Sequence, residues 1–474
     1  MSRPRVVIVG GGLAGLATAW ALSDFALDVV VLESRQRCGG RAGSFLDTDS
    51  GHEIDYCQHV AMGCCTNFLW WMRQCELIDQ FSRFRELTFF APHAPPARWA
   101  PNQRLPAPLH LAATLGKLPF LNRAQRAEVR RGIWRLMRSE PSPANAQTMG
   151  DWLRDAGQSS ATVEHFWDVI LISALGEQAQ HVAVAPARKV FVDGFLAAHQ
   201  AADVWIPKPP LAELFGRQLT DVLRARGVTL ECGQMVKRLF HEKTQVAGVE
   251  TTAGRIGAQQ VVLAVPWHGL ERLVANTPAA MAIANLSEIT ELPTSPITGL
   301  HLWFDRPITQ RRHSVLVGGL AQWLFRPEHP AANSAIGTEH YYQVVVSASR
   351  DLRQMEASEA TSQILKELQN HFPQTKTANL LRSRIVTDPR SVFSVRPATE
   401  AIRPSQQTTD RGLHLAGDYT LTGWPATMEG AVISGFLAAD GVLRSTGLGS
   451  FPPQPPLPMG RLARWLMRPS EQPF

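Results

Sequence analysis

Two short apolar runs with a helix-like segment between them open the pattern of hydrophobic and polar positions along the chain. Arg5–Val9 (RVVIV) and residues 28–32 (DVVVL) are continuous runs rich in β-branched side chains, which is typical of strands buried on both faces of a parallel sheet. Residues 16–23 between them have helical composition. The pattern therefore predicts a βαβ unit at the start of the chain.

A second patterned region lies in the middle of the chain. Residues 211–226 have the spacing of an amphipathic helix. Segments with strand-like composition follow at residues 228–230, 233–239, 245–250 and 260–266. We expect the last of these, QVVLAVP, to return to the same sheet as the first two strands.

The loop that joins the first strand to the first helix is rich in glycine. Residues 10–15 read GGGLAG, which is the G-x-G-x-x-G spacing of dinucleotide-binding loops. Gly10 permits the tight turn, Gly12 lets the backbone approach a pyrophosphate, and Gly15 lets the helix pack against the strand. The helix would point its free N–H groups and the positive end of its dipole at the phosphate. The residues expected to contact the nucleotide are Gly10, Gly12, Leu13, Ala14 and Gly15.

A carboxylate stands at the end of the second strand. Glu33 follows Gly15 by 18 residues, which is about where an acid accepts hydrogen bonds from ribose hydroxyls. Strand, glycine loop, helix, second strand and terminal acid together predict a Rossmann-type nucleotide site that includes Glu33 and Ser34.

Six residues after Glu33 the chain reads Gly39-Gly40-Arg41. Here it resembles the flavin amine oxidase and phytoene desaturase superfamily, in which such a run closes over the FAD pyrophosphate. Arginine makes charge-assisted hydrogen bonds to phosphate. The resemblance implies that the cofactor is FAD, bound without a covalent link, and that Gly40 and Arg41 contact it.

The same resemblance extends to the middle and the end of the chain. In the superfamily, a valine of the middle region contacts the adenine, and Val236 stands at the matching position. Residues 413–418 form an expected strand that ends in Gly-Asp, and a helix is expected from about Thr427. The resemblance implies that Asp418 binds the ribityl or pyrophosphate region. It also places the N-terminus of this helix at the flavin pyrimidine, where a helix dipole stabilises negative charge. The cofactor residues assigned in this way are Val236, Gly417, Asp418, Ala426, Thr427 and Met428.

The predicted fold is α/β, with a Rossmann-type FAD-binding domain of the GR2 class and an interleaved α+β substrate domain. The FAD-binding domain is predicted to comprise residues 1–75, 210–285 and 405–445. The substrate domain is predicted from residues 76–209 and 286–404, and a Pro-rich tail with a basic amphipathic end from residues 446–474.

The charge balance argues against a nucleic-acid partner. The net charge is +6, and the basic residues are scattered rather than gathered in one stripe. Two basic clusters, at residues 123–138 and 461–468, lie in amphipathic segments. Residues 105–138 and 461–468 are therefore candidates for contact with an anionic membrane surface, and a solvated basic surface is the competing interpretation.

The cysteines and the lengths of the apolar runs indicate where in the cell the protein is expected to be. None of the six cysteines forms a CxxC, and we expect reduced thiols rather than a metal site or disulfides. No run of 18 charge-free apolar residues predicts a membrane span. We expect a cytoplasmic protein, with peripheral attachment to the inner face of the cytoplasmic membrane as the open alternative.

One segment narrows the expected reaction. Residues 54–66 read IDYCQHVAMGCCT, which resembles the D-N-G-Q-H-V-L-x-G-C-Y-T segment of hydroxysqualene dehydroxylases, bacterial FAD enzymes associated with squalene. Tyr56 and Cys57 depart from that pattern, which puts the local backbone in doubt. Further similarities lie at residues 105–110, 265–268, 301–305 and 423–427. The resemblance implies the reduction of hydroxysqualene to squalene.

Such a reaction needs an acid near the hydroxyl group and a dry apolar tunnel for the isoprenoid chain. His59 is the candidate acid because the reference pKa of histidine is near neutrality, and Gln58 could orient the hydroxyl. A structural, hydrogen-bonding histidine is the competing interpretation of His59. Aromatic faces tolerate cations, so tryptophans are candidates for the tunnel wall. They are Trp70, Trp71, Trp152, Trp167, Trp205 and Trp303.

Three other functions remain open at this point. A carotenoid-type desaturase would have the same fold but would pass hydride to oxidised flavin. An amine oxidase is less favoured because no local lysine motif is evident, and a prenyl-binding protein without flavin is disfavoured by the complete set of cofactor residues. No second dinucleotide loop is evident, so the sequence does not identify the electron donor of the flavin.

Overall fold

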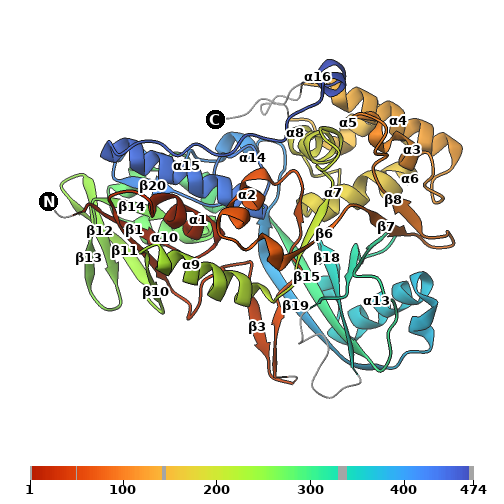
Figure 1. Ribbon diagram of the computed structural model, residues 1–474, viewed down its shortest axis with the longest axis horizontal. Helices are drawn as coiled ribbons and strands as arrows, with labels where there is room; N and C mark the ends of the chain where they lie inside the picture. The colour runs from red at the N-terminus through yellow and green to blue at the C-terminus, as the bar shows by residue number, and fades with distance from the viewer. Residues whose placement is uncertain (1–2, 50, 141–145, 329–338, 469–474) are drawn as a thin grey trace.

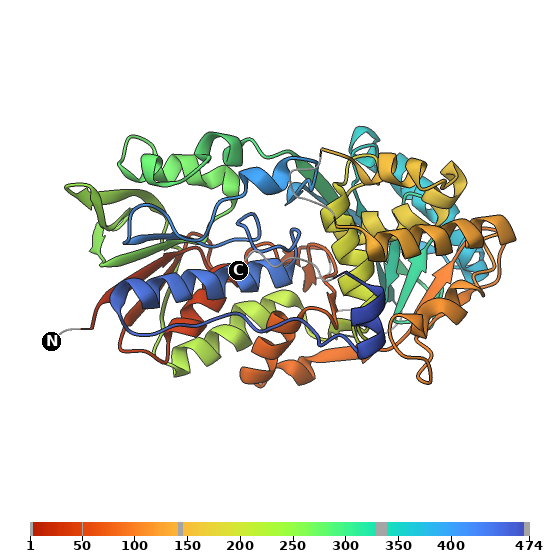
Figure 2. The same ribbon diagram turned by 90° about the horizontal axis from the view of Figure 1, so that it is seen from above.

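The computed structural model describes residues 3–49, 51–140, 146–328 and 339–468. Residues 141–145 and 329–338 of the predicted substrate domain, and residues 469–474 of the predicted tail, lie outside the described residues. The molecule is elongated, with a parallel sheet towards one end and a large antiparallel sheet towards the other (Figures 1 and 2).

A five-stranded parallel sheet forms the first end, in the order β10-β2-β1-β14-β20. The strands are β1 (Arg5–Val9), β2 (Asp28–Glu33), β10 (Thr229–Cys232), β14 (Gln260–Leu263) and β20 (Leu413–Leu415). The predicted βαβ unit is present, since β1 and β2 pair in parallel with Val6 opposite Val29. The predicted return of a middle strand is also present, because β14 lies beside β1.

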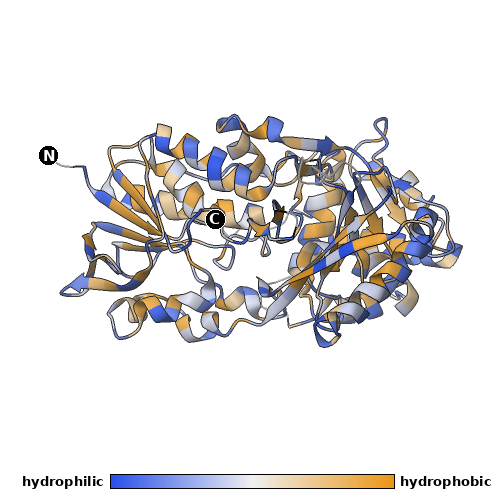
Figure 3. Ribbon diagram, turned by 90° about the horizontal axis from the view of Figure 1, so that it is seen from below, coloured by the Kyte–Doolittle hydropathy of each residue, from blue (hydrophilic) through white to orange (hydrophobic). Residues whose placement is uncertain are grey.

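The two faces of this sheet are buried under different layers. Val6 and Ile8 of β1 pack against one layer, whereas Val7 and Val9 face the other. The first layer contains α1 (Leu13–Leu22), α9 (Leu219–Ala225) and α15 (Met428–Thr446). The second contains the meander β11 (Val236–Glu242), β12 (Gln245–Thr251) and β13 (Arg255–Gly257), with α10 (Leu270–Val274). Cover on both faces explains why most residues of the central strands β1, β2 and β14 are apolar, in keeping with the orange colour of strands near the N-terminus in Figure 3.

A seven-stranded, mostly antiparallel sheet dominates the other end, in the order β19-β15-β18-β17-β16-β7-β8. Its strands are β7 (Leu87–Phe90), β8 (Ala97–Trp99), β15 (Thr294–Phe304), β16 (His313–Leu316), β17 (Trp323–Phe325), β18 (His340–Ser347) and β19 (Leu380–Phe393). Leu300 and Leu302 of β15 point to one face, where α13 (Ala357–His371) covers them.

Helices cover the other face of the antiparallel sheet (Figure 1). They are α3 (Ala112–Leu115), α4 (Arg123–Arg138), α5 (Met149–Asp155), α6 (Ser160–Thr162), α7 (Asp168–Leu175) and α8 (Val184–Arg188), with the π-helical segments η3 (Val163–Trp167) and η4 (Lys189–Leu196). α4 begins with a capping box, in which Asn122 accepts a hydrogen bond from the Gln125 backbone and the Gln125 side chain returns one to the Asn122 backbone.

Short elements connect the two ends. The hairpin β3 (Ser44–Asp47) and β4 (His52–Asp55) leads into a small sheet of β5 (Ala61–Met62), β9 (Val204–Pro207) and β6 (Phe81–Phe84). α2 (Thr66–Gln74) and the π-helical η5 (Ala212–Gln218) pack on the parallel-sheet end. The remaining α-helices of the described residues are α11 (Ala279–Ala282), α12 (Leu286–Thr290), α14 (Thr399–Ile402) and α16 (Arg461–Leu466). Among the described residues, no helix has the length and apolar character needed to cross a bilayer.

Candidate active site

The glycine loop between β1 and α1 has the geometry of a phosphate-binding turn. Gly10 has a φ of +113°, which side chains rarely adopt, and its N–H donates to the Leu32 carbonyl at 2.8 Å. A Cβ on Gly15 would lie 2.0 Å from the Gly10 carbonyl oxygen, so the helix can meet the loop only with glycine there. α1 begins at Leu13, which Ala14 follows in the first turn, and the N-cap Gly12 has no side chain to cap the helix. The first N–H groups of the helix are therefore left for a ligand.

Glu33 holds the loop in place. One oxygen of its carboxylate accepts a hydrogen bond from the Gly11 N–H at 2.8 Å. The other accepts from the Arg35 N–H at 2.8 Å and from the Ser34 hydroxyl at 3.2 Å. The side chain is buried, so the acid predicted to meet a ribose also fixes the turn beside it.

A cleft of about 430 Å³ opens beside this loop. Its lining brings together three residues predicted from the sequence, Gly10, Ser34 and Val236. Other residues that line it were missed by the sequence reasoning, and they include Gln234, His268, Arg272 and Arg390. Burial is the main cause of the lowered pKa of His268, and the positive charges of Arg390 and Arg41 add to it. The cleft thus carries a local excess of positive charge, which suits a phosphate.

Arg41 and Asp418 join the two ends of the chain. An Arg41 nitrogen lies 2.5 Å from a carboxylate oxygen of Asp418, which is almost fully buried. Arg41 also donates to the Ser391 carbonyl at 2.7 Å, and its guanidinium lies over the Trp267 ring. The sequence gives no sign of this pairing, because its partners are 377 positions apart.

The loop after β20 is held by a buried arginine that the sequence reasoning missed. Arg403 donates to the backbone carbonyls of Asp418 at 3.0 Å and Tyr419 at 3.2 Å. It also donates to the Thr420 carbonyl at 2.5 Å and forms an ion pair with Glu400. Arg403 thereby fixes the backbone that presents Asp418, and it does so through the backbone carbonyls of the loop.

α15 begins where the sequence predicts it. Thr427 is the N-cap, and its hydroxyl accepts a hydrogen bond from the Gly430 N–H at 3.1 Å. Ala426, Thr427 and Met428 are partly exposed, whereas the helix beyond them is mostly buried. Gly417, at the start of the loop, donates its N–H to the Ser434 hydroxyl at 2.8 Å and so ties the loop to α15.

These residues fit a dinucleotide with a flavin. A pyrophosphate has room between the cleft and the uncapped start of α1. The space at Gly12 is open, because a Cβ placed there would have its nearest neighbour, Gly40 Cα, at 3.9 Å. Two buried polar atoms, Gln234 Oε1 and Tyr419 Oη, have no hydrogen-bond partner among the described residues. Buried polar atoms are normally paired, and Gln234 lines the cleft, so its unpartnered oxygen is available to a bound ligand.

His59 lies close enough to Arg41 for the arginine charge to affect its protonation. Its Nδ1 donates to the Cys57 carbonyl at 2.8 Å, so Nε2 is the nitrogen that could face a substrate. Burial, and to a smaller extent the charge of Arg41, lower the pKa of His59, while the bond to Cys57 acts in the opposite direction. The imidazole is therefore neutral near pH 7, which favours hydrogen-bond acceptance over proton donation.

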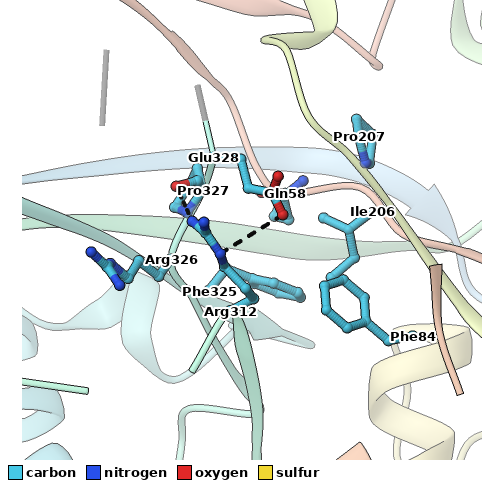
Figure 4. A pocket seen from close by; sticks show the side chains of 9 residues that line it. All are labelled: Gln58, Phe84, Ile206, Pro207, Arg312, Phe325, Arg326, Pro327 and Glu328. Carbon is cyan, nitrogen blue, oxygen red and sulfur yellow. Dashed lines mark hydrogen bonds and ion pairs between the residues drawn. The ribbon is translucent and has the colours of Figure 1, made fainter. Parts of the chain in front are cut away.

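Gln58 faces a different place. It lines a small pocket of about 10 Å³ beside Phe84, Ile206 and Arg312, which is the size of one water molecule (Figure 4). Arg312 is turned to the Pro327 carbonyl and to Glu328 in the same pocket. Gln58 and His59 are adjacent in the sequence, but their side chains lie in different surroundings.

The six tryptophans predicted for a tunnel wall do not form one surface. Trp167 belongs to an aromatic cluster of the antiparallel-sheet end, whereas Trp70 packs with Trp20 at the parallel-sheet end. Trp303 lies under the Arg382 guanidinium at 3.5 Å. No group of three or more potential ligand side chains in the described residues is arranged to hold a metal ion.

Known proteins resemble this chain over nearly its whole length. The profile of the "Flavin containing amine oxidoreductase" family matches residues 13–443. A probable zeta-carotene desaturase from Synechococcus elongatus is 25% identical, over 94% of this chain and 100% of that protein. A hydroxysqualene dehydroxylase from Rhodopseudomonas palustris is 26% identical, over 92% of this chain and 98% of that protein.

A solved structure supports the same fold. An oxidoreductase from Methanosarcina mazei superposes with a TM-score of 0.68 at 17% identity, covering 91% of this chain and 98% of that one. The predicted fold class and the predicted cofactor are confirmed. The chain belongs to the flavin containing amine oxidoreductase family, and it is an FAD-dependent oxidoreductase with carotenoid desaturases among its relatives.

Proposed function

We propose that the protein reduces hydroxysqualene to squalene. The observation that carries this proposal is the position of His59, close to Arg41 of the cofactor site and inside the 54–66 segment that resembles hydroxysqualene dehydroxylases. The similarity to the Rhodopseudomonas palustris protein of that name supports it.

The reaction divides into an acid step and a hydride step. When the allylic hydroxyl is protonated, its C–O bond breaks, water leaves, and an allylic cation remains. When bound in its reduced form, FAD would supply the hydride that quenches this cation. His59 is the proposed proton donor. The sequence-based proposal that Gln58 orients the hydroxyl would require its side chain to leave the separate pocket that it lines.

The lowered pKa of His59 gives this proposal a direction of pH dependence. A histidine that donates a proton must first be protonated, so turnover should rise as the pH falls below 6.5 towards the lowered pKa. A desaturase that uses the same imidazole as a base would show the opposite slope. In either case the His59→Ala variant should lose this limb of the pH profile.

The proposed isoprenoid tunnel would have to run beside an aromatic cluster that is packed in the core of the antiparallel-sheet end. Trp99 lies near Phe166 and Phe195, and Phe191 contacts Trp167, all with ring centroids 4.7–6.4 Å apart. Their rings are buried. Such faces stabilise a carbocation without offering it a nucleophile.

The direct test uses the purified holoprotein under anaerobic conditions. FAD is reduced with dithionite, hydroxysqualene is added, and the lipids are analysed by mass spectrometry. Squalene formed in step with flavin reoxidation supports the proposal. The second candidate, a carotenoid desaturase, rests on the equally similar zeta-carotene desaturase relative, and desaturation of phytoene or zeta-carotene by oxidised flavin, without squalene formation, would favour it.

We also propose a peripheral contact with the inner face of the cytoplasmic membrane through α4 and α16. The C-terminal ends of the two helices are linked where the Arg468 N–H, two residues after α16, donates to the Met137 carbonyl of α4 at 3.0 Å. Arg188 donates to the Leu136 carbonyl of α4 at 3.2 Å and to the Arg468 carbonyl. Trp134 on α4 and Trp465 on α16 are 48% and 77% exposed. Exposed arginines surround them: Arg130, Arg131, Arg135, Arg138, Arg461, Arg464 and Arg468. Exposed tryptophan amid basic residues suits an anionic lipid interface.

The surface is smaller than the sequence predicts. Of the apolar half of residues 105–138, Leu111, Leu115, Leu118 and Leu121 are buried in the core, so they cannot meet a membrane. Flotation with vesicles of phosphatidylcholine, with and without phosphatidylglycerol, tests what remains. Binding should need the anionic lipid and weaken in Trp134→Ala/Trp465→Ala, but not in the control Met281→Ala, whose side chain is 91% exposed elsewhere. A protein that stays in the unbound fraction with both vesicles contradicts the contact.

A further inference from the structure

A largely buried ion pair lies beside the loop that precedes α15. Lys189 is the first residue of η4, and its ammonium nitrogen is 3.1 Å from a carboxylate oxygen of Asp193. The same ammonium lies 4.8 Å from the centroid of the Trp424 ring. The two charged side chains are only 18% and 17% exposed, so neither is an ordinary surface charge.

The surroundings of this pair place it against the reactive part of the site. Trp424 stands three residues before Thr427, the N-cap of α15. Burial raises the pKa of Glu429, in the first turn of α15, to about 7. Hydrogen bonds from Phe68 and Asn67 oppose that rise, and the charge of Lys189 adds a smaller effect in the same direction as these bonds. Lys189 is therefore close to the helix end that the resemblance assigns to the flavin pyrimidine.

The other side of η4 meets the segment that carries His59. A Cβ on Gly194 would lie 3.9 Å from Cys64 Sγ. The backbone following η4 continues this contact, since Cys64 N–H donates to the Ala201 carbonyl at 3.0 Å. η4 thus lies between the closing loop of the cofactor site and the 54–66 segment. π-Helical insertions of this kind are frequent at functional sites.

The electrostatics of this position follow from the cofactor chemistry. Reduction of a flavin adds electrons, and a nearby cation stabilises the added negative charge more than it stabilises the oxidised ring. The positive end of the α15 dipole acts in the same direction. Low solvent exposure leaves the Lys189 charge weakly screened, and the Asp193 carboxylate opposes it.

We propose that the Lys189–Asp193 pair sets the reduction potential of the bound FAD, with Lys189 raising the potential and Asp193 limiting the rise. This inference rests on the FAD-dependent family membership of the chain and not on hydroxysqualene as the substrate. Lys189 and Asp193 are therefore expected to have opposite effects on the reduction potential of the bound FAD.

The test measures the midpoint potential of the holoprotein by anaerobic equilibration with reference dyes, without any substrate. Lys189→Met should favour oxidised over reduced FAD by about tenfold, which is about 30 mV towards negative potential for a two-electron couple. Asp193→Asn should shift the potential in the positive direction. Lys366→Met, an exposed lysine on α13 at the far end of the molecule, should leave it unchanged.

Shifts of opposite sign support the inference. Unchanged potentials in both variants, or shifts of the same sign, overturn it. If Lys189→Met fails to retain FAD, the Asp193→Asn variant decides, because its predicted shift is positive and a loosened site has no reason to stabilise the reduced cofactor. A failure of the hydroxysqualene assay would leave this result untouched, since no substrate enters the measurement.

Discussion

The nucleotide end and the reactive end of the cofactor site are built in different ways. The nucleotide end uses short segments, with Gly10, Ser34 and Val236 lining a cleft of about 430 Å³. The reactive end, which comprises the loop after β20 and the start of α15, depends on pairs that are distant in the sequence, such as Arg41 with Asp418. Local sequence therefore determines where the nucleotide binds, while tertiary packing determines what surrounds the reacting atoms.

The largest expected effect tests the nucleotide end. In Gly15→Ala the new Cβ would lie 2.0 Å from the Gly10 carbonyl oxygen, so α1 or the loop must move. We expect loss of bound FAD, measured as the ratio of flavin absorbance to protein absorbance after purification. The matched control is Gly257→Ala on β13, whose Cβ would find its nearest neighbour, the Ala247 carbonyl, at 3.9 Å. A Gly15→Ala protein with full FAD content would show that the close packing of this loop is dispensable.

A smaller effect is expected from the support of the reactive end. Arg403→Met removes the guanidinium that holds the carbonyls of Asp418, Tyr419 and Thr420 and leaves Glu400 without its partner. Glu400 is partly exposed, so the main cost comes from the buried carbonyls left without a donor, roughly 1–3 kcal/mol for each. We expect a lower melting temperature, and FAD affinity reduced by at least about tenfold. A Glu400→Gln variant, which keeps the carbonyl contacts, should retain most of the affinity, and equal losses in both variants would argue against the backbone contacts as the cause.

The smallest expected effect concerns acid sensitivity at the antiparallel-sheet end. Burial, assisted by His199, lowers the pKa of His110 to about 4, against about 6.5 for histidine in an unfolded chain. Between these two pH values the His110 imidazole is mostly protonated in the unfolded chain and mostly neutral in the folded chain. The lowered pKa of His110 therefore does not reduce the free energy of unfolding above pH 6.5, and it reduces it progressively as the pH falls towards 4.

His110→Phe should therefore show a shallower fall of melting temperature between pH 6.5 and 4.5, measured by circular dichroism. His181→Phe, at an exposed position, serves as the control and should keep the wild-type slope. His414, on β20 at the parallel-sheet end, also has a pKa lowered by burial to about 4. Part of the acid sensitivity should consequently persist in His110→Phe.

The sequence predicts the fold and cofactor because their signals are local. The glycine loop, Glu33 and the Gly39-Gly40-Arg41 run each occupy a few consecutive residues, and the fold and the FAD assignment derived from them are confirmed. The individual contact residues stay predictions. Arg403 and Lys189 gave no signal because an arginine or a lysine acquires its role only from a distant loop or helix. The protonation of His59 was equally hidden, since it depends on burial and on the charge of Arg41.

The pairing of Arg41 with Asp418 has a consequence for how the protein is made. The two residues are separated by 377 positions, and synthesis at about 5–20 residues per second takes roughly 20–75 s to cover that distance. During this interval the glycine loop exists on the ribosome without β20, the final strand of its sheet, and without α15, which covers it. One edge and one face of the sheet therefore stay uncovered for many seconds, and the pair can form only after the chain has been synthesised through Asp418.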